Sequence, residues 1–184
     1  SWIDYCKTLI DTYHIDKVVS IVSGGNTGQE SIYNGLKKAN ELYSEDSIVL
    51  IHDGVRPLID RNTISNAIIC VKENGSAITV SPAIETVVIK QTEDKVEQIL
   101  NRKSCHHAKA PQCFILKDIF EAHNKAKKEQ KNDFIDSAFL MQYYGYELHT
   151  IEGTSENIKI TTPSDFYMFR AIVEAREISE NFNI

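Results

Sequence analysis

The first eighty residues alternate between short apolar runs and longer stretches in which apolar residues recur every three or four positions. Recurrence at that interval indicates an amphipathic helix, and a short apolar run between turn residues indicates a buried strand. The pattern predicts strands at 18–22, 47–52 and 77–80. It predicts helices at the start of the chain, from about Thr27, and up to Gly75. Such alternation is typical of an α/β fold with a mostly parallel sheet and helices on both faces.

The alternation breaks after residue 80. Two β-rich runs, 85–90 and 95–100, flank the polar stretch 91–94, which predicts a β-hairpin arm that projects from the sheet. Helices are then predicted at 116–127 and 136–144, and strands at 146–151 and 156–160. Thr162 can cap a last helix whose first residue is Pro163. No repeat or linker interrupts the chain, so we expect one domain over 1–184 that contains an arm at 84–102.

Two segments at predicted strand ends carry reactive side chains. Asp53 and Arg56 follow the apolar run 48–51, and Lys159 lies at the end of the run 157–160. Ligands of open α/β sheets bind outside the carboxyl ends of the strands. An acid there can hold a metal ion, and the Arg and Lys can meet an anion. The set predicts phosphate chemistry with a divalent metal.

The composition of the chain limits the classes of molecule that it is expected to bind. The 184 residues carry a net charge of −6 and no basic stripe, which disfavours nucleic acid but allows a small anionic substrate. No stretch approaches the length of a membrane span, and no signal peptide is recognisable, so we expect no membrane partner. Four cysteines without a disulfide pattern favour a reducing cytoplasm. The group Cys105-His106-His107 with Cys113 fits no usual zinc spacing.

Four segments in one order, 24–36, 52–57, 110–114 and 157–161, resemble a single family. It comprises 2-C-methyl-D-erythritol 4-phosphate cytidylyltransferases and the related ribitol-5-phosphate cytidylyltransferases. The resemblance covers essentially the whole chain. It implies a Rossmann-like three-layer α/β sandwich, transfer of CMP from CTP to a polyol phosphate with Mg²⁺, and release of pyrophosphate. It also implies a homodimer that pairs through the projecting β-arms.

The family motifs assign candidate roles to individual positions. The catalytic candidates are Asp53, Lys159 and Arg102; the substrate-binding candidates are Arg56, Thr86, Asp136, Gly25 and Ser31; the metal ligand is Asp53. By resemblance, Gly25 and Ser31 contact cytosine, and Lys159 neutralises charge on the phosphates. Thr86 and Arg102 serve the substrate site of the neighbouring subunit. Positioning and electrostatics dominate such a reaction, because a substrate phosphate oxygen is itself the nucleophile.

The chain also departs from the family pattern. The family begins with a strand and a Gly-rich loop that cradles the triphosphate of CTP, whereas this chain begins inside a helix. We therefore expect an N-terminally incomplete piece of an enzyme, which by itself can be inactive. Gly28, Ala110 and Ile135 replace a usual Arg, Thr and Thr. The last two positions belong to the polyol-phosphate pocket, so they bear on substrate identity.

Several functions stay open at this point. Methylerythritol phosphate is the first-choice substrate, and ribitol 5-phosphate is the alternative. A different class is a non-catalytic module that binds nucleotide weakly and dimerises through the arm. A nucleotide-sugar glycosyltransferase would need an Asp-x-Asp metal motif, which His52-Asp53-Gly54 does not provide.

Overall fold

The computed structural model describes residues 2–182, which form two compact units. The first unit contains the chain up to Val49 together with Phe114–Leu148, and the second contains Leu50–Cys113 and the chain from His149 onward. Among the described residues, no helix combines the length and apolar character needed to cross a membrane. The single domain predicted over 1–184 stays a prediction.

The first unit is helical. Its helices are α1 (Trp2–Thr12), α2 (Gly28–Leu42), α4 (Leu116–Lys128) and α5 (Ser137–Tyr143), and α4 packs against both α2 and α5. Helix α2 begins where the sequence predicts, because the Thr27 hydroxyl accepts a hydrogen bond of 3.1 Å from the Glu30 amide. Helix α4 places Leu116, Ile119 and Ala122 in the core. The predicted helices at the chain start, after Thr27, and near 116–127 and 136–144 are confirmed.

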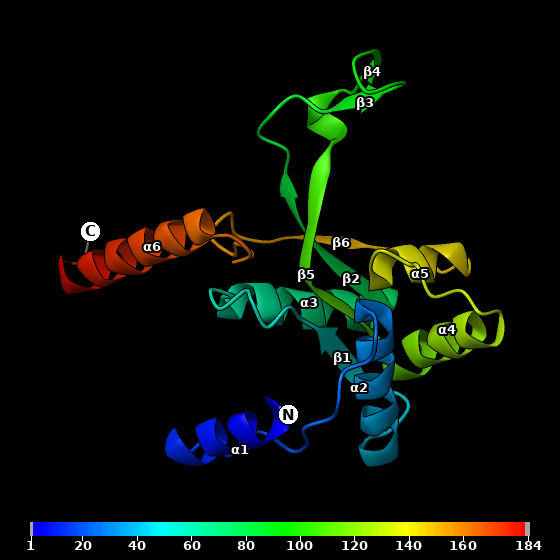
Figure 1. Ribbon diagram of the computed structural model, residues 1–184, viewed down its shortest axis with the longest axis vertical. Coiled ribbons are helices and arrows are strands. Elements are labelled where there is room, and N and C mark those ends of the chain that lie inside the picture. Colours follow the sequence, from blue (N-terminus) through cyan, green and yellow to red (C-terminus); the bar gives the residue numbers. More distant parts are fainter. Residues whose placement is uncertain (1, 183–184) are drawn as a thin grey trace. The chain divides into compact units, whose positions relative to one another are not determined.

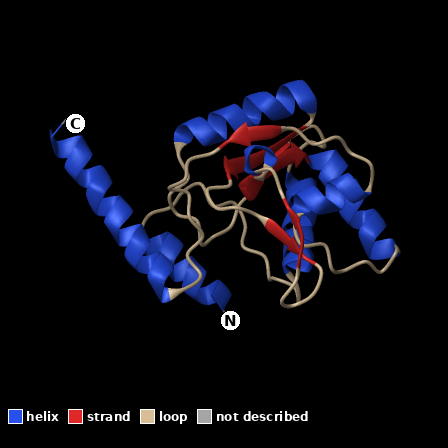
Figure 2. Ribbon diagram, turned by 90° about the horizontal axis from the view of Figure 1, so that it is seen from above, coloured by secondary structure: helices blue, strands red, loops and turns tan. Residues whose placement is uncertain are grey.

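The second unit carries most of a four-stranded sheet in the order β1-β5-β2-β6. The strands are β1 (Ile48–Ile51), β2 (Ser76–Pro82), β5 (His106–Ile115) and β6 (Thr150–Glu152), and β2 pairs parallel with β6. Helix α3 (Arg61–Asn74) packs on β2 and β6, and Figure 2 shows these strands side by side, apart from the two strands of the arm. The predicted α/β class with parallel pairing is confirmed.

The ends of α3 and α6 (Pro163–Phe182) follow their predicted capping signals. Gly75 ends α3 in the left-handed conformation, with a φ of 81° that a glycine adopts without strain. At the start of α6, the Thr162 hydroxyl accepts from the Asp165 amide at 3.3 Å, and Asp165 accepts from the Thr162 amide at 2.8 Å. This reciprocal capping box fixes where the helix begins.

The predicted hairpin arm is present. Strands β3 (Val88–Lys90) and β4 (Val96–Ile99) form a separate antiparallel ribbon with an irregularity between Ile89 and Lys90. Figure 1 shows the ribbon at the end of a stem that leaves β2 and returns into β5. Hydrogen bonds of 2.9 Å from Leu100 to Val87 and 3.0 Å from Ala83 to Cys105 hold the stem together. The arm is therefore an ordered part of the second unit.

Three strand predictions need correction. Residues 18–22 form no strand, and Val19 is 67% exposed, because no described strand pairs with this segment. Residues 156–160 also form no strand, since the amides of Asn157 and Ile158 bond locally to Thr154 and Glu156. The predicted strand at 146–151 is shorter and later, at Thr150–Glu152. Conversely, β5 was not predicted, because Pro111 and the polar residues before it interrupt the usual strand pattern.

Candidate active site

Asp53 lies two residues after the end of β1, and two cations face it. Its Oδ2 accepts a 2.9 Å hydrogen bond from Nε of Arg56, and Nζ of Lys159 lies 3.5 Å from the same oxygen. The tight turn from Asp53 to Arg56 is closed by a 3.0 Å backbone hydrogen bond between these residues. The three side chains predicted to form a phosphate site therefore meet in the second unit.

Arg56 is the most buried member of this group, with a side chain only 11% exposed. Its Nη1 donates to the carbonyl of Asn157 at 2.9 Å, and its own carbonyl lies 2.9 Å from Nε2 of His52. These bonds hold the guanidinium before any ligand arrives. A pre-positioned cation loses little conformational entropy when an anion binds.

Lys159 lies on an irregular loop rather than on the predicted strand. Asn157 anchors this loop, since it is 1% exposed and its Nδ2 donates to the Ala110 carbonyl at 2.7 Å. The Ile160 amide donates to the Val55 carbonyl at 2.9 Å, and Arg176 of α6 pairs with Glu156 at 2.6 Å. Tertiary hydrogen bonds thus supply the order that a strand ladder would otherwise give.

The charges of this group act on the ionisation of Asp53. Partial burial opposes ionisation, but the hydrogen bond from Arg56 and the positive charges of Lys159 and Arg56 outweigh it, so the pKa of Asp53 lies below its ordinary value. The carboxylate is therefore charged throughout the neutral range. A permanently charged oxygen donor between two cations suits a site that handles phosphates and a metal ion.

A third cation, Lys109 on β5, belongs to the same neighbourhood. Its Nζ donates to the carbonyls of Thr154 at 3.2 Å and Ser155 at 3.4 Å, on the loop that leads to Lys159. Burial, followed by the positive charge of Arg56, lowers the pKa of Lys109. No pattern in the sequence indicates a role for this residue.

In the first unit, Gly25 and Ser31 contact each other at the start of α2. The Gly25 amide donates to the Ser31 hydroxyl at 3.0 Å, and that hydroxyl donates to the Thr27 carbonyl at 2.9 Å. Next to them, the Asn26 amide donates to the Glu30 carboxylate at 2.7 Å. The loop before α2 is thus folded back on the first turn of the helix, which presents its backbone in one fixed conformation.

Gly25→Ala is expected to disturb this loop, whereas Gly28→Ala is not. A Cβ at Gly25 would overlap Cγ and Cβ of Glu30, while a Cβ at Gly28 meets no described atom within 4 Å. Moving Glu30 breaks its bond to Asn26, so we expect a loss of about 1 kcal/mol in the free energy of unfolding. Urea denaturation of both variants measures this loss. Equal behaviour of the two variants would contradict the close packing at Gly25.

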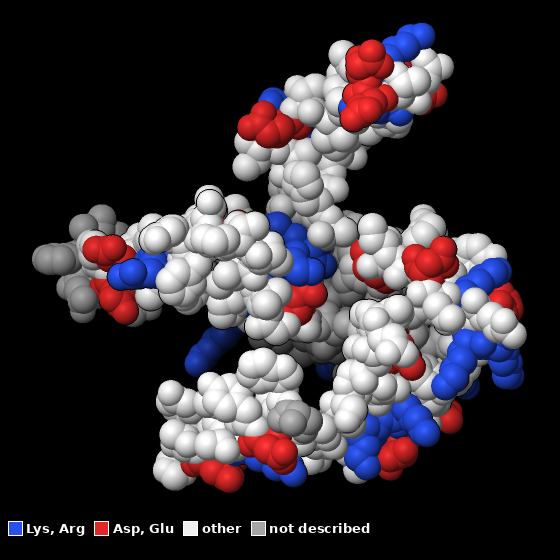
Figure 3. Space-filling view, viewed as in Figure 1, with Lys and Arg blue, Asp and Glu red and all other residues white. Residues whose placement is uncertain are grey.

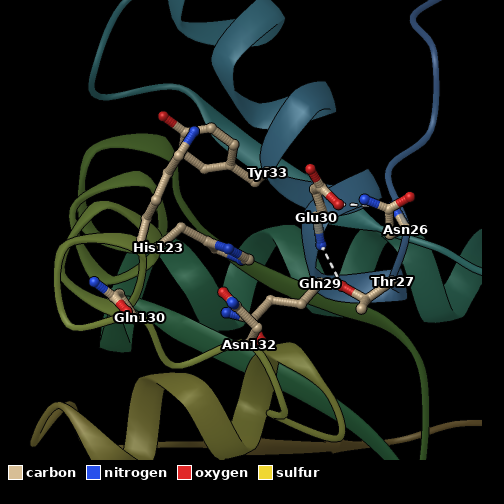
Figure 4. A pocket seen from close by; sticks show the side chains of 9 residues that line it. Asn26, Thr27, Gln29, Glu30, Tyr33, His123, Gln130 and Asn132 are labelled. Carbon is tan, nitrogen blue, oxygen red and sulfur yellow. Dashed lines mark hydrogen bonds between the residues drawn. The ribbon is translucent and has the colours of Figure 1, made fainter.

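A polar cavity of about 360 Å³ lies beside the same helix start. Its lining side chains come from α2, from α4 and from the segments next to these helices: Asn26, Thr27, Gln29, Glu30, Tyr33, His123, Lys127, Gln130 and Asn132. Figure 4 shows His123 among the side chains that line it. His123 is 2% exposed, its Nε2 has no partner among the described residues, and burial lowers its pKa to about 4. It is therefore uncharged at neutral pH.

Comparison with known proteins places these features in a family. The sequence profile of 2-C-methyl-D-erythritol 4-phosphate cytidylyltransferase (IspD) matches residues 4–175. The chain belongs to this family. It is a nucleotidyltransferase, more narrowly a cytidylyltransferase that acts on a polyol phosphate.

Individual relatives carry two different names. A ribitol-5-phosphate cytidylyltransferase of Vibrio parahaemolyticus is 48% identical over 176 residues, which are 96% of this chain and 74% of that protein. A 2-C-methyl-D-erythritol 4-phosphate cytidylyltransferase of Clostridium botulinum is 36% identical over 94% of this chain and 73% of its own length. The crystal structure of 4-diphosphocytidyl-2C-methyl-D-erythritol synthase from Anaerococcus prevotii superposes with a TM-score of 0.83 at 27% identity, over 94% of this chain and 74% of that one. The last match supports the Rossmann-like fold.

The residues predicted to form the active site do not all contact one another. Asp53, Arg56 and Lys159 lie together, whereas no described hydrogen bond or ion pair joins Thr86 or Arg102 to them. Thr86 is exposed on the arm, and Arg102, in the 3₁₀ turn Arg102–Ser104, donates to the Ile84 carbonyl at 3.0 Å. In this arrangement, neither residue completes the Asp53 site through a direct bond within its own chain.

Asp136 belongs to the first unit, together with Gly25 and Ser31. Its carboxylate accepts a 2.8 Å hydrogen bond from the Phe139 amide and caps the start of α5. The family motif predicted an acid before this helix, and the structure has one there. Its role toward substrate stays a prediction.

No individual role was predicted from the sequence for two residues of the second unit, Asn157 and Lys109. Asn157 lies inside a recognised motif, but only its burial and its bond to Ala110 reveal it as the anchor of the Lys159 loop. Lys109 directly precedes the motif that begins at Ala110. The only available signal was a lysine immediately before the buried run 110–114, which alone is too weak to indicate a site.

Proposed function

We propose that this cytidylyltransferase transfers CMP from CTP to ribitol 5-phosphate, forming CDP-ribitol and pyrophosphate. The observation that supports this substrate is the identity of 48% to a ribitol-5-phosphate cytidylyltransferase, against 36% to a methylerythritol-phosphate enzyme. The sequence analysis put methylerythritol phosphate first, and the relatives favour its alternative. Ala110 and Ile135, which depart from the pattern expected for the pocket, agree with a changed substrate.

The residues around Asp53 suit the chemistry of this transfer. A phosphate oxygen of the polyol phosphate attacks the α-phosphorus of CTP, and the bond from that phosphorus to the bridging oxygen breaks as pyrophosphate leaves. No general base is needed, because the attacking phosphate is already ionised at neutral pH. Arg56 would hold the polyol phosphate, and Lys159 would neutralise charge that builds on the phosphates. Gly25 and Ser31 would contact the cytosine.

The donor set fits a Mg²⁺ ion held mostly by substrate. Mg²⁺ is commonly bound by one or two carboxylates together with phosphate oxygens. In the described part of the chain, Asp53 uses Oδ2 for both cations, and no hydrogen bond or ion pair engages its Oδ1. Asp53 would therefore hold the ion through Oδ1 while Arg56 and Lys159 keep the carboxylate in place. The bound ion would supply charge neutralisation between the phosphates.

Comparison of kcat/KM for the two polyol phosphates tests the proposed function. The full-length protein is assayed by pyrophosphate release with CTP, Mg²⁺ and either ribitol 5-phosphate or 2-C-methyl-D-erythritol 4-phosphate. We expect kcat/KM for ribitol 5-phosphate to be higher by at least about a hundredfold, since a site matched to particular hydroxyls rejects analogues that leave its polar groups unpaired. A higher kcat/KM for methylerythritol phosphate would overturn the ribitol assignment and leave the reaction class intact.

We also propose that the arm joins two copies of this chain. Its ribbon exposes apolar side chains to 44% at Val88, 42% at Ile89, 51% at Val96 and 66% at Ile99. Charged side chains of both signs gather at the end of the arm (Figure 3), which suits that end to solvent. Apolar strand edges invite pairing, and a two-fold axis would cover the ribbons of both chains with each other. Thr86 and Arg102 would then reach the site of the partner subunit.

Replacement of residues 87–100 by a short Gly-Ser turn is expected to convert a dimer to a monomer and to abolish CMP transfer. The matched control replaces only the tip residues Thr92, Glu93 and Asp94, which keeps the apolar ribbon. Light scattering at micromolar concentration measures the mass, and pyrophosphate release measures activity. The proposal would be wrong if the unaltered protein were a monomer. It would also be wrong if the variant without the arm stayed dimeric and active.

A further inference from the structure

Three cations and one acid make up the charged group around Asp53. Arg56 and Lys159 both contact Asp53, at 2.9 and 3.5 Å. Lys109 differs from them, since no described carboxylate lies within ion-pair distance of its Nζ. Glu156, on the neighbouring loop, is paired with Arg176 instead. The group therefore consists of three cationic side chains and one carboxylate, and two of the cations contact that carboxylate.

Arg56 and Lys109 hold the same short loop from its backbone. Lys109 donates to the carbonyls of residues 154 and 155, and Arg56 donates to the carbonyl of residue 157. Bonds to carbonyls so close in sequence bring the two cationic groups near each other. The positive charge of Arg56 contributes, after burial, to the lowered pKa of Lys109, which agrees with this proximity. Like charges so placed raise the free energy of the empty site, and a bound anion removes that cost.

The ammonium of Lys109 has capacity left for a ligand. A lysine ammonium carries three N–H donors, and carbonyl oxygens of Thr154 and Ser155 take two of them. No other described group takes the third. A phosphate has several acceptor oxygens and a charge near −2 at neutral pH, so one phosphate can be shared by a guanidinium and an ammonium.

We propose that Lys109 is a further substrate-binding residue, which shares the phosphate group of the polyol phosphate with Arg56. The inference rests on the proposed function for the identity of the substrate, but not for the presence of an anion site. Arg56 supplies a flat, fixed pair of donors, and Lys109 supplies a point charge on the β5 side. Lys159 is left for the phosphates of CTP, so the positive charges are divided between the two substrates.

Lys109→Gln tests this role, because the amide keeps an N–H donor for the loop carbonyls and loses the charge. We expect KM for the polyol phosphate to rise about tenfold, as for loss of one charged hydrogen bond, with kcat and KM for CTP changed by less than about threefold. Lys109→Arg is expected to restore most of the affinity. Lys72→Gln, on the exposed side of α3, is the matched control and is expected to leave all constants unchanged. A fall in kcat with KM unchanged would show that Lys109 acts in the transition state rather than in binding the polyol phosphate, and would overturn the proposal.

Binding of inorganic phosphate separates this proposal from the proposed function. Isothermal titration calorimetry measures its affinity for the parental protein and for Lys109→Gln without CTP or polyol, together with thermal unfolding of each. We expect about tenfold weaker binding in the variant, with the midpoint of unfolding unchanged. Equal phosphate affinity in both proteins would overturn the role of Lys109, whichever polyol phosphate the enzyme uses. A preference for methylerythritol phosphate would refute only the ribitol assignment.

Discussion

Asp53→Asn is expected to lower the rate of CMP transfer by more than about a hundredfold. Substitution of residues that only support a metal ligand already lowers metal affinity or activity by about ten- to a hundredfold, and Asp53 would be a ligand itself. The substitution keeps the shape of the side chain and one oxygen. It removes the negative charge that would hold Mg²⁺ between the phosphates and that now balances Arg56 and Lys159. Pyrophosphate release at saturating Mg²⁺ measures the loss.

The control for this variant is Asp46→Asn, which makes the same chemical change at an exposed position before β1. It is expected to retain parental activity. Circular dichroism of both variants shows whether the fold is intact. If Asp53→Asn kept more than about a tenth of the parental rate, the assignment of Asp53 as a metal ligand would be wrong.

Asp53 also makes stability depend on pH in a defined direction. Its pKa in the folded protein lies below the ordinary value, so its stabilising effect is complete above the pKa of the unfolded chain. The effect is lost as the pH falls through the lower, folded-state pKa. Asp53→Asn should therefore make the free energy of unfolding depend less on pH at acidic pH. This change in pH dependence distinguishes the loss of the charge from a general loss of structure.

Lys159→Ala is expected to lower kcat by about a hundredfold, comparable with the removal of one donor to a developing charge, while KM changes much less. Lys159 is 48% exposed and contributes little packing, so the midpoint of thermal unfolding should not change. Stopped-flow or steady-state kinetics with both substrates give the two constants separately.

Lys128→Ala, at the exposed end of α4, is the control for this substitution. It removes an equal charge at a residue that no described hydrogen bond or ion pair joins to Asp53, and it is expected to leave kcat unchanged. A Lys159→Ala protein with unchanged kcat and a raised KM would show that the residue binds substrate equally in the ground and transition states. Its assigned role would then be wrong.

Local chemistry explains which predictions from sequence were accurate. Asp53 was placed correctly because a four-residue apolar strand followed by an acid is a local signal. Thr162 was identified correctly as the cap of the last helix for the same reason, since a capping box depends on residues three positions apart. Gly75 and the arm likewise carry their signals within a few residues.

The incorrect predictions concern features that depend on distant residues. The apolar run 18–22 has strand character, but a strand requires a neighbour to pair with, and none of the described strands does so. Lys159 was placed on the wrong kind of element, because the bonds that order its loop come from Arg56, Lys109 and Arg176. None of these partners lies nearby in the sequence, so no local pattern could reveal them.

The same bonds restrict how this site can diverge in evolution. Arg56 and Lys109 donate to the carbonyls of residues 154, 155 and 157, so each is both a candidate ligand for substrate and a support for the loop that carries Lys159. A single substitution that removes both the charge and the N–H donors of either side chain also removes a support from the loop. New substrate preferences are therefore expected to arise through paired changes, one that alters the pocket and one that supplies a replacement donor for the loop.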